Sequence, residues 1–247
     1  AQFDDMETGN FFMRISFTSE DGVDLATLRA GFVDTAAEFD MTWDFHDEAE
    51  KMKVIIMVSR FGHCLNDLLY RYRSGALDMD ITGIVSNHPD LEYLAKSHDL
   101  PFHHCPITKE TKPQQEAKWM KLVEGTKTDL VVLARYMQIL SDEQTAHFAG
   151  RCINIHHSFL PGFKGARPYH QAYEAGVKLI GATAHYVSAD LDEGPIIEQA
   201  VERVHHRQSA RDLAAVGRDI ESMVLARAIR YHVEHRVLVN GRRTVGL

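Results

Sequence analysis

The run Val54-Ile55-Ile56-Met57-Val58 decides the fold class of this 247-residue chain, because five apolar residues follow one another without interruption. A strand with one buried face alternates apolar and polar residues, whereas a strand covered on both faces reads as a continuous apolar run. Both faces are covered chiefly in parallel sheets, whose crossover helices pack above and below. The run therefore predicts a buried strand of a parallel sheet in an α/β domain.

Similar segments follow toward the C-terminus. Further strands are expected at 81–85, around Phe102, and at 130–133, 152–155, 182–187 and 196–201. Helices are expected at 65–72, 91–97, 114–124 and 210–233, with a terminal hairpin through Asn240-Gly241. The β–α alternation predicts a doubly wound sheet with right-handed crossovers. The strands at 182–187 and 196–201 have no helix between them, so we expect a mostly parallel, mixed sheet.

The first 46 residues have a different pattern. Residues 11–17 alternate as a half-buried strand does, residues 25–39 have helical spacing behind the cap residue Asp24, and residues 41–45 read as another strand. This unit is too small for a good core of its own. A charged stretch follows, so we expect a small unit at 1–46, a linker at 47–52 and the main domain at 53–247.

Composition excludes several classes of partner. The net charge is −8 and no basic stripe stands out, so no nucleic-acid partner is expected. No apolar run is long enough to cross a bilayer and no signal peptide is evident, so we expect no membrane partner and a cytoplasmic location. The three cysteines fit a reducing compartment and lack zinc-ligand spacing, so no metal is expected.

Three polar residues are candidates for one site. Asn154 and His156 end a central strand, and ligands of doubly wound sheets bind beyond the carboxyl ends of strands. Asn can donate to a developing oxyanion, His can carry a proton near neutral pH, and Asp192 can fix the tautomer of that His. The set is sufficient for moving an acyl group. Spacing alone leaves two alternatives open: His156 caps a loop and has no catalytic role, and Asp192 belongs to an ordinary surface turn.

Neighbouring residues support other chemistries less well. His157 should point to the opposite side of the chain from His156, in a structural or substrate-neighbouring role. Ser158 lacks the glycine-flanked elbow of a nucleophile and is expected to hydrogen-bond within its loop. Residues 59–64 follow the first buried strand with one glycine only, so a dinucleotide-dependent oxidoreductase is not expected.

The segment Asn154 to Pro161, together with residues 191–195, resembles the formyltransferase family that uses 10-formyl-tetrahydrofolate. By that resemblance, the catalytic residues of the family fall on Asn154, His156 and Asp192. Residues 133–141 resemble its folate-pocket segment. The resemblance implies that folate is the substrate and that no cofactor is needed. It also implies folate contacts at Met137, Ile139, Leu140, Ser188, Asp190 and Leu191.

Three departures distinguish the chain from the glycinamide ribonucleotide formyltransferases. Residues 59–64 replace their glycine-rich phosphate loop, His157 replaces the Pro after the catalytic His, and an additional N-terminal unit is present. These departures resemble the hydrolases of the family, which release tetrahydrofolate and formate for one-carbon and purine metabolism. The alternatives are formyl transfer to an amine such as glycinamide ribonucleotide, and a non-catalytic folate-binding regulator.

The same resemblance implies an ACT-type regulatory unit at the N-terminal end. Such a unit is βαββαβ, and residues 1–46 resemble something like its second half, so we expect the first half to lie outside this chain. The unit implies an amino-acid effector. Because ACT-type sheets commonly pair and an unpaired half would expose strand edges, a homo-oligomer, either a dimer or a tetramer, is expected.

Overall fold

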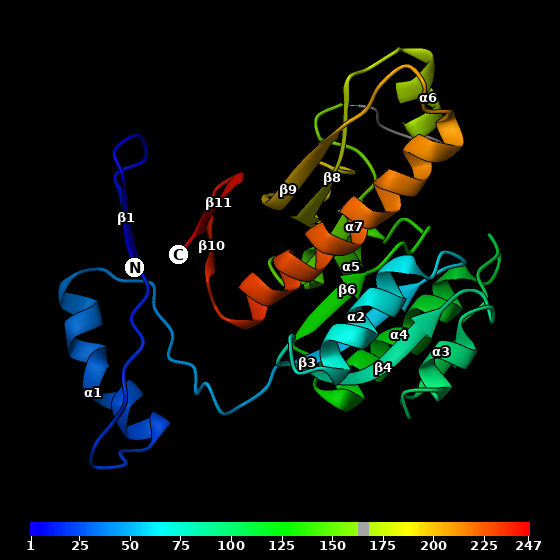
Figure 1. Cartoon of the computed structure of the whole chain (residues 1–247). Helices are drawn as coiled ribbons and strands as arrows, with labels where there is room; N and C mark the ends of the chain where they lie inside the picture. Colours follow the sequence, from blue (N-terminus) through cyan, green and yellow to red (C-terminus); the bar gives the residue numbers. More distant parts are fainter. Residues whose placement is uncertain (163–167) are drawn as a thin grey trace.

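The computed structural model describes residues 1–162 and 168–247. Its main body contains a seven-stranded sheet (Figure 1). In spatial order the strands are β5 (Phe102–His104), β4 (Asp80–Ser86), β3 (Lys53–Val58), β6 (Leu130–Leu133), β7 (Cys152–His156), β8 (Leu179–Tyr186) and β9 (Ile196–Arg203). The first five run parallel, whereas β8 and β9 are antiparallel to their neighbours. The expected mostly parallel, mixed sheet is thus confirmed.

Helices cover both faces of this sheet. They are α2 (His63–Arg73), α3 (Glu92–Lys96), α4 (Lys112–Thr126), α5 (Asp142–His147), α6 (Pro168–Glu174) and α7 (Ala210–Val233). Along β3, Val54, Ile56 and Val58 face the core that contains α2 and α7. Ile55 and Met57 face the core that contains α4. All five side chains are fully buried, which explains the uninterrupted apolar run.

Ile56→Ala should lower the free energy of unfolding by about 2–5 kcal/mol, because it removes buried methyl groups and leaves a cavity in the central strand. Ile56 has no exposed surface. Urea unfolding followed by circular dichroism measures the change. Val33→Ala, at a position that is 52% exposed, is the matched control and should change stability by less than about 0.5 kcal/mol. Equal effects of the two substitutions would contradict this description of the core.

The N-terminal unit consists of β1 (Gln2–Asp5), β2 (Asn10–Met13) and α1 (Leu25–Glu38). Strands β1 and β2 form a hairpin, of which β1 was not predicted from the sequence. The expected Asp24 cap is confirmed, since its carboxylate accepts from the backbone N–H of Thr27 at 2.7 Å.

The strand predicted at 41–45 is wrong, because this segment pairs with no other strand among the described residues. Trp43 and Phe45 instead pack edge-on against Phe32 of α1, with ring centroids 5.1 and 5.5 Å away. Aromatic side chains raise strand propensity, but here they fasten an irregular segment to a helix.

This unit contacts the C-terminal hairpin, formed by β10 (Val237–Asn240) and β11 (Arg243–Gly246). The side-chain amide of Asn240 donates to the Asp5 carboxylate at 2.6 Å. The rings of His46 and His235 stack with centroids 3.5 Å apart. Figure 1 shows α1 and β1 set apart from the large sheet, joined to it by an extended stretch.

Among the described helices, none combines the length and apolar character needed to span a membrane.

Candidate active site

The site lies where β7 and β8 run side by side near the carboxyl end of β7. Asn154 and His156 are two residues apart on β7, so their side chains project from the same face. In the antiparallel register, Asn154 pairs with His185 and His156 pairs with Thr183. Asp192 belongs to the loop that leaves β8. The register of β7 and β8 therefore positions four of these residues, and the loop after β8 brings in the Asp192 carboxylate.

The Asp192 carboxylate lies between two imidazoles. Its Oδ2 is 3.2 Å from Nδ1 of His156, and its Oδ1 is 3.7 Å from Nε2 of His185. The His185 Nε2 is also 3.2 Å from the side-chain nitrogen of Asn154. The structure thus brings Asn154, His156 and Asp192 together, as predicted. It adds His185, which the sequence reasoning missed.

Charge and backbone geometry both mark Asp192 as unusual. Burial alone would raise the pKa of this carboxyl, but the hydrogen bond and attraction of His156 outweigh it and hold the pKa well below its usual range. The carboxylate therefore stays charged at neutral pH. Its backbone has φ +59°, a left-handed conformation that is uncommon outside glycine, although aspartate adopts it more readily than most residues.

Hydrogen bonding fixes the protons of the site. His185 Nδ1 donates to the carbonyl oxygen of Tyr186 at 2.8 Å, so its Nε2 is the acceptor for the Asn154 amide. One N–H of that amide is then held and the second is available to a ligand. On His156, the Asp192 carboxylate favours a proton on Nδ1. The His156 Nε2 is buried and has no hydrogen-bond partner in the described part of the chain.

Hydrogen bonds of Thr183 hold the loop that follows β7. The Thr183 hydroxyl donates to the carbonyl of Ser158 at 2.9 Å and accepts from the backbone N–H of Leu160 at 3.1 Å. Ser158 donates to the Gly162 carbonyl, which fits its expected role within the loop. The expectation that the His157 side chain points away from His156 is wrong, because its ring stacks on that of His156 with centroids 5.1 Å apart and an interplanar angle of 14°. Strand alternation ends at His156, because β7 ends there.

The residues expected to contact folate lie on two segments, one that follows β6 and one that follows β8. Met137 and Ile139 follow β6 and are 51% and 62% exposed, and Leu191 is 60% exposed. The backbone N–H of Met137 donates to the Ser59 hydroxyl at 2.9 Å, and Leu140 packs against the core that contains α4. Ser188 donates to the carbonyl of Asp190. Two hollows of about 310 and 340 Å³ flank the loop, one reaching Ser188 and the other Asp192.

The fold and these side chains define a formyl transferase domain, and the family model described as formyl transferase matches residues 52–229. The chain belongs to the formyltetrahydrofolate deformylase family of enzymes, as its closer similarities show. It is 52% identical over 247 residues to formyltetrahydrofolate deformylase from Corynebacterium sp. (strain P-1), covering 100% of this chain and 86% of that relative.

Solved structures agree with this assignment. Formyltetrahydrofolate deformylase from Burkholderia mallei ATCC 23344 is 57% identical, with a TM-score of 0.95 over 100% of this chain and 88% of that one. Glycinamide ribonucleotide transformylase 1 from Symbiobacterium toebii is more distant, at 30% identity and a TM-score of 0.75 over 84% of this chain and 98% of that one. This transformylase therefore shares the fold but is a remoter relative.

Proposed function

We propose that the protein hydrolyses 10-formyl-tetrahydrofolate to tetrahydrofolate and formate, with Asn154, His156 and Asp192 as its catalytic residues. The observation that carries the proposal is the Asp192 carboxylate, held 3.2 Å from Nδ1 of His156. The opposite nitrogen of that ring is buried without a hydrogen-bond partner in the described part of the chain, and one N–H of Asn154 is not held by His185. The family membership supports the same reaction.

In the proposed mechanism, water attacks the formyl carbon and the carbonyl oxygen gains negative charge. The free N–H of Asn154 donates to that oxygen, as a donor of an oxyanion hole does. The C–N bond then breaks and the nitrogen of tetrahydrofolate takes up a proton. That nitrogen is attached to an aromatic ring, so it is a weak base and leaves without strong acid assistance. No metal or redox step enters this mechanism.

The proton transfer is assigned to His156. A carboxylate whose pKa lies well below the usual range is a weak base, which disfavours Asp192 as the group that removes the proton. The unpartnered Nε2 of His156 supports this imidazole instead. Asp192 then orients the ring and stabilises its cationic form.

We propose that folate binds along the two segments described above, with contacts from Met137, Ile139, Leu140, Ser188, Asp190 and Leu191. The exposed apolar side chains of Met137, Ile139 and Leu191 suit a flat ring system. Burial of that surface against a ligand would contribute about 25 cal/mol for each Å² of apolar area removed from water.

The function is tested by incubating the protein with 10-formyl-tetrahydrofolate alone and measuring formate and tetrahydrofolate. Equal amounts of the two products, formed over many turnovers, are expected. Turnover that requires glycinamide ribonucleotide would identify a transferase instead. Folate binding without any turnover would support a regulator.

Gly194→Ala should lower the hydrolysis rate about 100-fold, because it displaces the loop that carries Asp192. A Cβ at this position would collide with the carbonyl oxygen of Tyr186 and approach Nδ1 of His185. The rate is measured at saturating folate. Gly125→Ala is the control, since a Cβ there meets nothing within 4 Å and neither Gly125 nor Gly194 has a positive φ. Full activity of Gly194→Ala would show that the loop tolerates displacement.

We further propose that residues 1–46 are part of an ACT-like regulatory unit, followed by a linker at 47–52 and a catalytic domain at 53–247. Exposed apolar side chains on its strands, including Phe3, Phe11 and Met13, suit association into a homo-oligomer. Light scattering would give the oligomeric state, and measuring the hydrolysis rate with each of a panel of amino acids would reveal an effector.

The three free cysteines suit a cytoplasmic location.

A further inference from the structure

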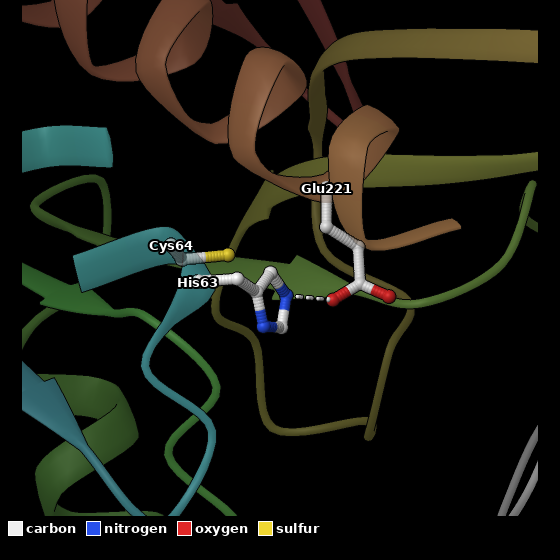
Figure 2. A group of neighbouring side chains, drawn as sticks. All are labelled: His63, Cys64 and Glu221. Atoms are coloured by element: carbon white, nitrogen blue, oxygen red, sulfur yellow. Dashed lines mark hydrogen bonds and ion pairs between the residues drawn. The ribbon is translucent and has the colours of Figure 1, made fainter. Parts of the chain in front are cut away.

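A second polar cluster occupies the topological switch point of the sheet. From β3 the chain proceeds to β4 on one side, while β6 lies on the other, and ligands of such sheets bind in the crevice outside the carboxyl ends there. His63, at the start of α2, follows β3, and Arg135 follows β6. Both reach Glu221 of α7. Figure 2 shows the His63 imidazole pointing at the Glu221 carboxylate.

The Glu221 carboxylate is enclosed by groups of its own chain. It is 1% exposed, and its Oε2 lies 2.7 Å from Nε2 of His63 and 3.3 Å from Nη1 of Arg135. Its Oε1 accepts from the Tyr169 hydroxyl at 2.6 Å. The guanidinium of Arg135 also lies over the ring of Phe61, 5.3 Å from its centroid. Both carboxylate oxygens are therefore engaged.

A metal ion is not the best occupant of this cluster, although ligand atoms of His63, Cys64 and Glu221 lie within 4.8 Å of one another. That set of donors suits zinc. However, the positive charge of Arg135 beside Glu221 opposes a second cation. Burial raises the pKa of the Cys64 thiol, so that it stays protonated, whereas a zinc ligand must be a thiolate.

The formation of this cluster costs free energy of folding. Arg135 has φ +64°, a conformation that favours glycine, its Nε is buried without a hydrogen-bond partner in the described part of the chain, and its Nη1 has only the ion pair with Glu221 at 3.3 Å. Buried ion pairs often contribute no more to stability than apolar side chains of similar size. Backbone strain and an unsatisfied donor together at a ligand crevice indicate a functional role.

The cluster borders the candidate active site. The Tyr169 ring that binds Glu221 lies 6.4 Å from the ring of His157, which stacks at 5.1 Å on His156. Gly217 of α7 makes room for Tyr169, since a Cβ there would collide with the tyrosine ring. A chain of rings thus leads from the cluster to the proposed proton carrier.

We propose that Arg135 and His63, held by Glu221, fill the side of the site that an amine acceptor would enter, so that water is the nucleophile admitted. This inference rests on the proposed hydrolysis. An acceptor amine must bring its nitrogen to the formyl carbon, and it needs more room than water does. At neutral pH most amines are cations, which Arg135 repels. The carboxylate that could bind such a cation, Glu221, is already occupied.

Arg135→Gly tests the proposal. The backbone conformation suits glycine, and Glu221 keeps His63 and Tyr169 as donors. The intact protein and the variant are incubated with 10-formyl-tetrahydrofolate and glycinamide, and formylglycinamide and formate are both measured. In the transfer reaction the amine nitrogen replaces the water oxygen at the formyl carbon, and tetrahydrofolate leaves as before. The ratio of formylglycinamide to formate should rise at least about tenfold in the variant.

Lys127→Gly is the matched control, because Lys127 is also a cation with positive φ (+52°) but is exposed at the end of α4. Its product ratio should equal that of the intact protein. An unchanged ratio in folded Arg135→Gly overturns the proposal. Loss of formate without any formylglycinamide also overturns it, since Arg135 would then serve the hydrolysis itself. If Arg135→Gly does not fold, His63→Ala opens the same cluster. The ratio of formylglycinamide to formate in that variant then tests the proposal in the same way. Formate release by the intact protein without amine tests the hydrolysis separately.

Discussion

Asp192→Asn should lower the rate of 10-formyl-tetrahydrofolate hydrolysis about 10²–10⁴-fold, the contribution of proton transfer, because His156 loses the carboxylate that orients it for that step. The amide keeps the shape of the side chain but removes the charge that faces both His156 and His185. The amide nitrogen could then face Nδ1 of His156, which would no longer be held as a donor. Formate release at saturating substrate gives the rate. Folate binding should persist, because none of the proposed folate contacts is changed.

Glu193→Gln is the control for this substitution. It removes one negative charge from the neighbouring position of the same loop, where Glu193 lies 3.5 Å from Arg242. The rate should change less than about threefold, as expected for an exposed ion pair of at most 1 kcal/mol. Near-full activity of Asp192→Asn would remove this carboxylate from the mechanism.

The pH profile provides a second readout. Burial raises the pKa of Asp192, but the hydrogen bond and attraction of His156 lower it by more, so the net pKa is depressed. A depressed pKa means that the stabilisation by the charged form is present above the unfolded value and is lost only as the pH falls through the folded value. Any loss of activity in mild acid therefore comes from another group. The residual activity of Asp192→Asn should fall over the same mildly acidic pH range as the activity of the intact protein.

The sequence predicted those parts of the fold that repeat a simple pattern. The apolar run at 54–58 indicated a strand buried on both faces, and its residues do alternate between two cores. The helix at 210–233 was predicted at its observed bounds. Helix α5 was missed, although Ser141 and Gln144 form a capping box that is legible in the sequence. A strand was wrongly predicted at 41–45 because aromatic residues pack as well on a helix as in a sheet.

The candidate site was predicted only where residues lie on one strand or in a motif. Asn154 and His156 share a strand, whereas His185 enters through the antiparallel register of β7 and β8. Placing residue 185 opposite Asn154 would have required that register. Glu221 and Arg135 were missed for a related reason, since 86 residues of chain separate them. Their ion pair exists only because α7 packs beside α2 and against β7 and β8.

Asn154→Ala should lower the hydrolysis rate about 10²–10³-fold, or by roughly 2.7–4 kcal/mol of transition-state stabilisation, as loss of one oxyanion-hole donor does. The structure gives the reason: the amide is held by Nε2 of His185 at 3.2 Å, so its second N–H is preoriented before substrate arrives. Since the charge on the formyl oxygen develops only in the transition state, kcat should fall while KM changes little. Steady-state kinetics on 10-formyl-tetrahydrofolate separate the two. Asn10→Ala, at an exposed amide of the N-terminal hairpin, is the control and should leave both constants unchanged. A rise in KM at unchanged kcat would instead make Asn154 a residue that binds ground-state substrate, and the oxyanion would need another donor.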